Sequence, residues 1–377
     1  MSFQTFLIFA LLVLLGADYF FSASAAHFFR ITGTANRLAL LAVIVFLSLS
    51  FIIASLLAHR QENTITRAYY FFSGFWLGLF LNLVMATVIV WLIIGISAFT
   101  SVKPSQSVLA CIFFGLAFVY SAYGTWNAFN PQVKNITVRI KNLPKAWRGK
   151  RIVQLSDVHL GFVYRADFLR KIVNETNALH PEMVVITGDL FDGMDGKLTE
   201  LVSPVNELQA PDGIYFITGN HETYLGVGKA FAALRQTKVT ILNDQMEDID
   251  GIRLIGISYP ERGEKKDIAK TIRSLPGFVP GKPTILLYHS PAFVGDAPDL
   301  GINLQLSGHT HKGQLFPFEF ITHRIYKGFD YGLQTLGDFS IYTTDGVGTW
   351  GPPMRTGNRP EIVCITLEKE RAVPADT

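Results

Sequence analysis

The sequence predicts a membrane region of four helices, residues 1–130, followed by an α/β domain, residues 131–377. Charged side chains are nearly absent from the first region, which holds two acidic and five basic residues. Its uncharged stretches reach the roughly 20 residues that cross the hydrocarbon core of a bilayer. From about Lys134, short apolar runs alternate with amphipathic helical patterns, which is typical of an α/β domain.

Four segments are predicted to span the membrane, at about residues 3–27, 38–58, 70–98 and 106–126. The first segment contains SASAA, which resembles the cleavage site of a signal peptide. However, its amino end, MSFQTF, carries no Lys or Arg, and three further apolar segments follow. We therefore interpret it as a span and expect a multi-pass integral protein of the cell membrane.

The basic residues that flank the spans predict the orientation of the chain. With four spans, both ends lie on one side, and that side carries Arg60, Arg67, Lys134, Arg139, Lys141 and Lys145. The opposite side carries Arg30, Arg37 and Lys103. Because Lys and Arg are more frequent in cytoplasmic loops, this difference predicts a cytoplasmic α/β domain.

The charge and cysteine content exclude other classes of protein. The chain holds 33 Lys+Arg and 30 Asp+Glu, and residues 1–130 contain five and two of these, so 28 of each sign remain in residues 131–377. A formally neutral domain has no basic surface for nucleic acid, and none is expected as a partner. Cys111 and Cys364 are too few for a disulfide framework or a zinc knuckle.

Six short apolar runs in the second region end in polar residues and are predicted to be buried strands. They are RIVQLSDVHLG, EMVVITGDLFDG, GIYFITGNHE, IRLIGIS, TILLYHSP and NLQLSGHTH. Residues 166–180 place apolar side chains along one helical face, and residues 199–208 and 227–236 are also expected to be helical. Strands that alternate with helices predict a βαβ arrangement, to which the later β-rich segments add a second sheet.

Potential metal ligands follow these strands, and ligands of such sheets bind beyond the carboxyl ends of the strands. The residues are Asp157, His159, Asp189, Asn220, His221, His289, His309 and His311. Oxygen and imidazole donors without thiolate suit Mn²⁺, Fe or Zn²⁺. If one carboxylate bridges two ions, the pair can acidify a bound water and promote in-line displacement at phosphorus.

Five blocks of the chain resemble the calcineurin-like metallophosphoesterase family over about residues 149–367. In order they are DVHLG, GDLFDG, GNHE, YHSP and GHTHKGQ. Four helices before such a domain are similar to the transmembrane members of the family. The resemblance implies two mixed β-sheets sandwiched between helices, and two divalent metal ions, with Mn²⁺ expected before Fe or Zn²⁺.

The resemblance also implies a role for each matching residue. The residues implied for the first metal are Asp157, His159 and His311, with Asp189 as the bridge. The residues implied to complete the second metal are Asn220, His289 and His309. His221 would protonate the leaving group, and Asp192 would orient the imidazole of His221.

The sequence departs from the family's protein phosphatases after the second block, where Gly193 replaces a phosphate-gripping arginine. This departure argues against phosphoprotein substrates and favours small or lipid-linked phosphoesters. Arg355 and Arg359, in a Gly- and Pro-rich stretch at residues 343–361, are candidates for holding a substrate phosphate. An equally good interpretation makes them solvated loop charges or partners of Glu361.

The expected function is a membrane-anchored, metal-dependent hydrolase of phosphomonoester, phosphodiester or pyrophosphate bonds. A membrane location suggests a lipid-linked or nucleotide-lipid substrate. The alternative is a membrane sensor or scaffold whose phosphoesterase-like domain is catalytically silent. A transporter is disfavoured, because the predicted spans contain only one acidic residue, Asp18. The sequence leaves the oligomeric state open.

Overall fold

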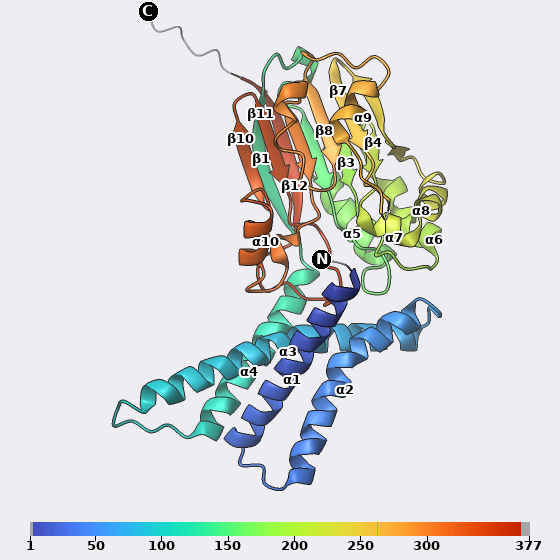
Figure 1. Cartoon of the computed structure of the whole chain (residues 1–377). Helices are drawn as coiled ribbons and strands as arrows, with labels where there is room; N and C mark the ends of the chain where they lie inside the picture. The colour runs from blue at the N-terminus through green and yellow to red at the C-terminus, as the bar shows by residue number, and fades with distance from the viewer. Residues whose placement is uncertain (1–2, 262, 371–377) are drawn as a thin grey trace, which may run out of the picture. The chain divides into compact units, whose positions relative to one another are not determined.

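A computed structural model describes residues 3–261 and 263–370 of the chain (Figure 1). The chain divides into two compact units. The helical unit comprises residues 1–126 and 351–356, and the α/β unit comprises residues 127–350 and 357–377. Four apolar helices followed by an α/β domain are the predicted fold class, which is confirmed.

Four long helices form the helical unit. They are α1 (Phe3–Phe28), α2 (Thr34–Ala58), α3 (Thr64–Ser97) and α4 (Gln106–Ala128), whose last two residues fall in the α/β unit. Each is long and apolar enough to cross a membrane. Helix α3 begins at Thr64, where the sequence predicted a start near residue 70, because Asn63 caps it. The Asn63 side chain accepts hydrogen bonds from the amides of Ile65 and Thr66.

Apolar packing and buried hydrogen bonds join the four helices. One apolar cluster includes a residue from each helix: Phe21, Ile44, Phe80 and Ala117. Asp18, on α1, is fully buried and accepts a hydrogen bond from Ser48 Oγ, on α2, at 2.7 Å. The amide of Asn82, on α3, donates to Ser121 Oγ, on α4, at 2.8 Å. In an apolar medium such bonds between helices stabilise their association.

Residues 351–356 belong to the helical unit because glycines on two helices admit them. A Cβ atom at Gly78, on α3, would lie 2.9 Å from Met354 Sδ, and one at Gly124, on α4, 2.6 Å from Thr356 Cγ2. The backbone amide of Arg355 donates to the Gly124 carbonyl at 2.9 Å. The sequence placed this segment within the α/β domain, because hydropathy and turn composition do not report contacts between distant parts of a chain.

Two six-stranded mixed sheets form the framework of the α/β unit (Figure 1). The first has the order β1 (Gln132–Ile140), β12 (Glu361–Lys369), β2 (Arg151–Leu155), β3 (Met183–Thr187), β4 (Ile214–Ile217), β5 (Thr240–Ile241). The second has the order β10 (Gly332–Leu336), β11 (Phe339–Thr343), β9 (Leu304–Ser307), β8 (Thr284–Tyr288), β7 (Ile252–Ile257), β6 (Gln245–Ile249). Strands β2 to β5 are parallel, as are β7, β8, β9 and β11.

Alternating side chains of the central strands separate the core into three layers. Val185, on β3, and Leu287, on β8, meet in the cluster between the two sheets. Their neighbours Ile186 and Leu286 point to the outer faces and belong to two other clusters. This alternation follows from the two-residue period of a strand, and it confirms the predicted sandwich.

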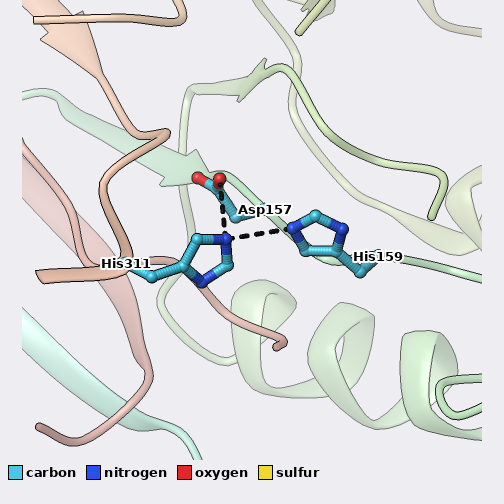
Figure 2. Close-up of side chains that lie close together, drawn as sticks. All are labelled: Asp157, His159 and His311. Carbon is cyan, nitrogen blue, oxygen red and sulfur yellow. Dashed lines mark hydrogen bonds and ion pairs between the residues drawn. The ribbon is translucent and has the colours of Figure 1, made fainter. Parts of the chain in front are cut away.

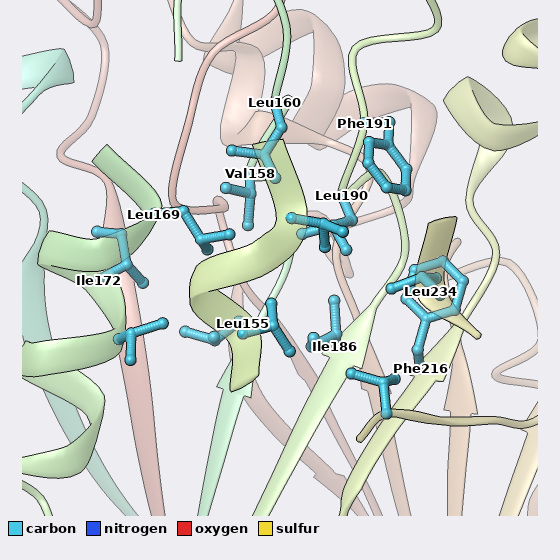
Figure 3. Packing of buried hydrophobic residues seen from close by; sticks show 14 of the residues in the cluster. Leu155, Val158, Leu160, Leu169, Ile172, Ile186, Leu190, Phe191, Phe216 and Leu234 are labelled. Atoms are coloured by element: carbon cyan, nitrogen blue, oxygen red, sulfur yellow. The ribbon is translucent and has the colours of Figure 1, made fainter. Parts of the chain in front are cut away.

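Helices cover both outer faces of the sandwich. Helices α5 (Ala166–Asn177), α6 (Leu198–Val202) and α8 (Val227–Leu234) supply residues to the cluster on the first sheet. Figure 3 shows Leu169 and Ile172 of α5 and Leu234 of α8 in this cluster. Helix α9 (Ile268–Ser274) supplies Ile272 to the cluster on the second sheet. The predicted helix over residues 199–208 is shorter, because α6 gives way at Pro204 to a 3-10 helix, Ser203–Glu207. Two short helices follow strands: α7 (Asn220–Leu225) comes after β4, and α10 (Glu319–Ile325) comes after β9.

Candidate metal centre

The eight candidate ligands that follow the strands converge, from both sheets, on one place. Asp157 and His159 follow β2, Asp189 follows β3, and Asn220 and His221 open α7 after β4. His289 follows β8, and His309 and His311 follow β9. Because these strands are parallel within each sheet, their carboxyl ends lie at one edge.

Asp157, His159 and His311 form the first group and are buried (Figure 2). His311 Nε2 lies 3.2 Å from Asp157 Oδ1 and 3.0 Å from His159 Nε2. The ligand atoms of the group lie within 4.8 Å of one another. Three neutral or anionic donors that point to one another at this spacing can hold one divalent cation.

Asp189, His289 and His309 form the second group. His289 Nε2 lies 3.0 Å from Asp189 Oδ2 and 3.2 Å from Asn220 Oδ1. His289 Nδ1 lies 2.7 Å from the carbonyl oxygen of Thr187, to which it donates a hydrogen bond. This bond leaves Nε2 available to ligate a metal, as is usual for histidine ligands.

Asp189 also belongs to a third group, with His159 and His221. The carboxylate therefore lies between donors of the first group and donors of the second. A carboxylate in this position is suited to bridge two cations, so the donor set fits a dinuclear site. The family and this donor set imply two divalent ions.

Three glycines allow the ligands to come this close. A Cβ atom at Gly308 would lie 2.2 Å from Asp157 Oδ2, and one at Gly219 would lie 2.2 Å from Asp189 Oδ1. At Gly188, where φ is +91°, a Cβ atom would lie 2.6 Å from His289 Nδ1. Real Cβ atoms do not approach other atoms this closely, so each glycine is required by the packing of a neighbouring ligand.

Five of the seven expected metal ligands have left-handed backbones. Their φ angles are 54° for Asp157, 54° for His159, 50° for Asp189, 74° for His309 and 47° for His311. Asp and His tolerate this conformation better than most residues. Such strain is maintained only where the surrounding structure imposes it, and it concentrates at functional sites.

The carboxylates and imidazoles shift the pKa values of one another. Burial would raise the pKa of Asp189, but the His289 and His221 imidazoles lower it well below its usual range. Burial opposes the charged form of His289, yet Asp189 raises its pKa to about 10, whereas burial and His289 lower the pKa of His309 to about 4. Asp189 and His309 are thus held in metal-binding forms, and His289 would release a proton when a cation binds.

Asp192 lies beside two histidines. Its Oδ1 atom is 3.3 Å from His159 Nδ1 and 3.8 Å from His221 Nδ1. The rings of these two histidines are 4.5 Å apart in an edge-to-face arrangement. Asp192 is therefore placed to orient an expected metal ligand as well as His221. Burial would lower the pKa of His221, but Asp189 and Asp192 outweigh it and raise the pKa above its usual value.

Sequence analysis assigned no role to Glu222, the last residue of the GNHE block. Glu222 is fully buried, and its carboxylate accepts hydrogen bonds from the backbone amides of Asp189, Phe191 and Gly219 at 2.7–3.0 Å. Burial and the Asp189 carboxylate raise the pKa of Glu222 to about 7. Glu222 thus joins the segments that carry Asp189 and Asn220. In the sequence, the only indication of this supporting role is that Glu222 is an acidic residue next to candidate ligands.

We expect Glu222→Gln to lower the free energy of unfolding by about 2 kcal/mol or more. The substituted amide would turn N–H groups toward backbone amides that need an acceptor. Thermal unfolding of the detergent-solubilised full chain measures the effect. The matched control is Glu200→Gln on α6, where the carboxylate is 67% exposed and pairs with Lys197 at 3.1 Å. An equal, small effect of both changes would contradict a supporting role for Glu222.

Arg355 and Arg359, the candidate phosphate contacts, fall in different units. Arg355 is fully buried and belongs to the helical unit, whereas Arg359 is exposed in the α/β unit. The interpretation of both as solvated loop charges is therefore wrong for Arg355. The carboxylate of Glu361 accepts hydrogen bonds from the hydroxyl groups of Tyr331, Tyr342 and Thr344.

Comparisons with known proteins place the chain in a family. Residues 150–313 match the family model for calcineurin-like phosphoesterases. An uncharacterized metallophosphoesterase of Campylobacter jejuni is 36% identical over 249 residues, which cover 64% of this chain and 64% of that protein. A transmembrane protein with metallophosphoesterase domain of Danio rerio is 35% identical, over 70% of this chain and 63% of that protein. An uncharacterized metallophosphoesterase of Aquifex aeolicus is 30% identical, over 67% of this chain and 98% of that protein.

The chain spans less than two thirds of the length of the Campylobacter and Danio relatives. Among solved structures, a dimetal phosphatase from Danio rerio covers 59% of this chain and 94% of its own, with 11% identity and a TM-score of 0.37. That degree of likeness is too low to bear on this chain.

Proposed function

Because the chain belongs to the calcineurin-like metallophosphoesterase family, we propose that it is a membrane-anchored hydrolase of phosphoesters that works with two divalent metal ions. The observation that carries this proposal is the position of Asp189, which belongs to two groups of ligand atoms at once. When bound, two ions lower the pKa of a coordinated water and stabilise charge at phosphorus.

Each residue has a role in the proposed site. Asp157, His159 and His311 would hold one ion, Asn220, His289 and His309 would hold the other, and Asp189 would serve both. Mn²⁺ is the first candidate for both positions, with Fe or Zn²⁺ as the alternatives. His221 donates a proton to the departing oxygen, and Asp192 holds the imidazoles of His159 and His221 in place.

Gly193 supports the choice of small or lipid-linked substrates over phosphoproteins. Its backbone has φ +78°, and a Cβ atom there would lie 3.3 Å from His221 Nδ1 and 3.4 Å from Tyr224 Cβ. A side chain at this position would press on the proposed acid. A side chain such as the phosphate-gripping arginine of the protein phosphatases would therefore be strained and crowded here, and the chain's apolar helices make a lipid-linked phosphoester the favoured substrate.

We expect His221→Ala to lower kcat by about 10²- to 10⁴-fold on an alkyl phosphoester, the range that general acids contribute. The loss should be smaller on bis-p-nitrophenyl phosphate, because p-nitrophenolate departs without protonation. Mn²⁺ content, measured by mass spectrometry, should show whether ligation survives.

The control is His180→Asn, because His180 is exposed and has a left-handed backbone that asparagine tolerates. If His221→Ala slows both substrates by the same factor, His221 does not act as the acid.

The α/β unit is proposed to be cytoplasmic, from the basic residues that flank the spans. Gln236, an exposed residue after α8, provides the test. A Gln236→Cys variant in a Cys111→Ser background should react with a membrane-impermeant maleimide only after cells are lysed. Reaction in intact cells would reverse the orientation.

A further inference from the structure

Helix α10 and the turn before it expose an apolar surface, which we call the α10 surface. It consists of Phe316, Phe318, Phe320, Ile321 and Ile325, whose side chains are between 40% and 65% exposed. None of the α10 residues is buried. Large apolar side chains gathered in one short segment mark an interaction surface rather than ordinary scattered exposure.

Contacts of Thr322 and His323 with Asp330 attach α10 to the rest of the α/β unit, although the His323 side chain is 70% exposed. Thr322 Oγ1 lies 3.4 Å from Asp330 Oδ2, and His323 Nδ1 lies 3.0 Å from Asp330 Oδ1. The Asp330 carbonyl accepts a hydrogen bond from Thr310 Oγ1, between the two ligand histidines of the last block, at 2.7 Å. At the end of the helix, the Tyr326 ring lies 6.1 Å from the His309 ring. These contacts join α10 to the segment that carries the candidate ligands, and the apolar side chains of the α10 surface remain exposed.

Basic side chains flank the α10 surface. Arg324 and Lys327 are exposed, whereas the acidic residues nearby are half-buried (Glu319, at the start of α10) or buried (Asp330). Aromatic and aliphatic side chains interspersed with cations are the composition of protein segments that lie in the interface of a bilayer. A long arginine side chain can lie along an apolar surface while its charged end reaches the headgroups.

We propose that the α10 surface docks into the surface of the membrane that the four helices span. The occupant is the lipid headgroup region, because the same chain carries both the spans and this surface, so the bilayer is always within its reach. A soluble partner would have to compete with the bilayer, whose effective concentration near the α10 surface is high because the same chain spans it. The inference rests on the membrane attachment in the proposed function and not on catalysis.

Docking of α10 would place the metal ligands of the last block next to the headgroups. His309 and His311 precede α10 and are tied to it through Thr310, Asp330 and Tyr326. The favoured substrate is then an amphiphile whose phosphoester lies at headgroup depth. A substrate buried in the acyl chains or free in water would gain nothing from this arrangement.

The test measures how deeply α10 lies in a bilayer. Nitroxide labels are placed at Phe320→Cys and, separately, at Ile325→Cys in the Cys111→Ser background, since Cys364 is buried. The full-length protein is reconstituted in nanodiscs of phosphatidylcholine and phosphatidylglycerol. Power saturation compares collisions with oxygen, which concentrates in lipid, and with a water-soluble nickel chelate.

Two control labels calibrate the result. Phe46→Cys reports the lipid-facing side of α2, where Phe46 is 61% exposed, and Gln236→Cys reports exposed polar surface. We expect labels 320 and 325 to collide less with the nickel chelate than label 236 does. Their ratio of oxygen to nickel collisions should be similar to that of label 46. Labels that rank with 236 overturn the proposal, and so does spin exchange between two copies, which would make a second chain the occupant. If label 46 itself ranks with 236, the membrane attachment fails, which is distinguishable from failure of α10 alone.

Discussion

Replacing Asp189 by Asn is expected to lower kcat/KM for bis-p-nitrophenyl phosphate by more than about a hundredfold, because loss of residues that merely support metal ligands already lowers affinity or activity by about 10- to 100-fold. The substitution keeps the shape of the side chain but removes the charge that two cations would share. Asp189 also accepts a hydrogen bond from the His221 amide at 2.8 Å, so the neutral amide weakens the position of the proposed acid.

Two measurements test this prediction. Steady-state kinetics in the presence of Mn²⁺ give the rate, and metal analysis of the purified full chain gives the number of bound ions. A fall from two bound ions toward one or none is expected together with the loss of rate. The matched control is Asp195→Asn, since the Asp195 carboxylate is 59% exposed and pairs with Lys229. Wild-type activity and metal content in Asp189→Asn would rule out a dinuclear site bridged by this residue.

Gly308→Ala is expected to remove metal binding without changing any ligand. A Cβ atom at this position would lie 2.1 Å from Ser156 Oγ and 2.2 Å from Asp157 Oδ2. Asp157 is fully buried and accepts a hydrogen bond from the His309 amide at 3.1 Å, so the carboxylate cannot move aside without disturbing both segments. Overpacking of this kind lowers the free energy of unfolding by about 1–3 kcal/mol.

Isothermal titration with Mn²⁺ and thermal unfolding of the full chain measure the two effects. The control is Gly228→Ala in α8, where a Cβ atom would meet nothing within 4 Å. Because alanine favours a helix over glycine, that change should leave stability unaltered or raise it by up to about 1 kcal/mol. If Gly308→Ala bound Mn²⁺ as tightly as the control, the close approach of Gly308 to Asp157 would not matter to the site.

The long helices, the parallel strands and the edge where the candidate ligands lie could be predicted from residue types and their local order. The apolar length of the four helices predicted their existence, because crossing hydrocarbon requires a run of uncharged side chains. The alternation of strands with helices predicted the parallel strands, and polar residues after Leu155, Thr187 and Ser307 marked the edge where ligands gather. The helix starts were less predictable: the start of α3 depends on the Asn63 cap, which lies outside the apolar run.

The geometry of the site required contacts between segments far apart in the sequence. Which candidate ligands would share a cation depends on the approach of His159 to His311 and of His289 to Asp189. The supporting role of Glu222 depends on amides more than 30 residues upstream as well as on that of Gly219.

The sequence by itself determined the kinds of candidate donor, their places after strands and the apolar length of the helices in the first region. Only the tertiary structure decided that Asp189 lies between two groups of candidate ligands and that residues 351–356 pack in the helical unit. It also showed that Gly188, Gly219 and Gly308 are required for the close approach of candidate ligands to the backbone. The physical reason is that hydropathy and turn preference act over a few neighbouring residues, whereas a metal site is built from distances between side chains that only the packed sheets bring together.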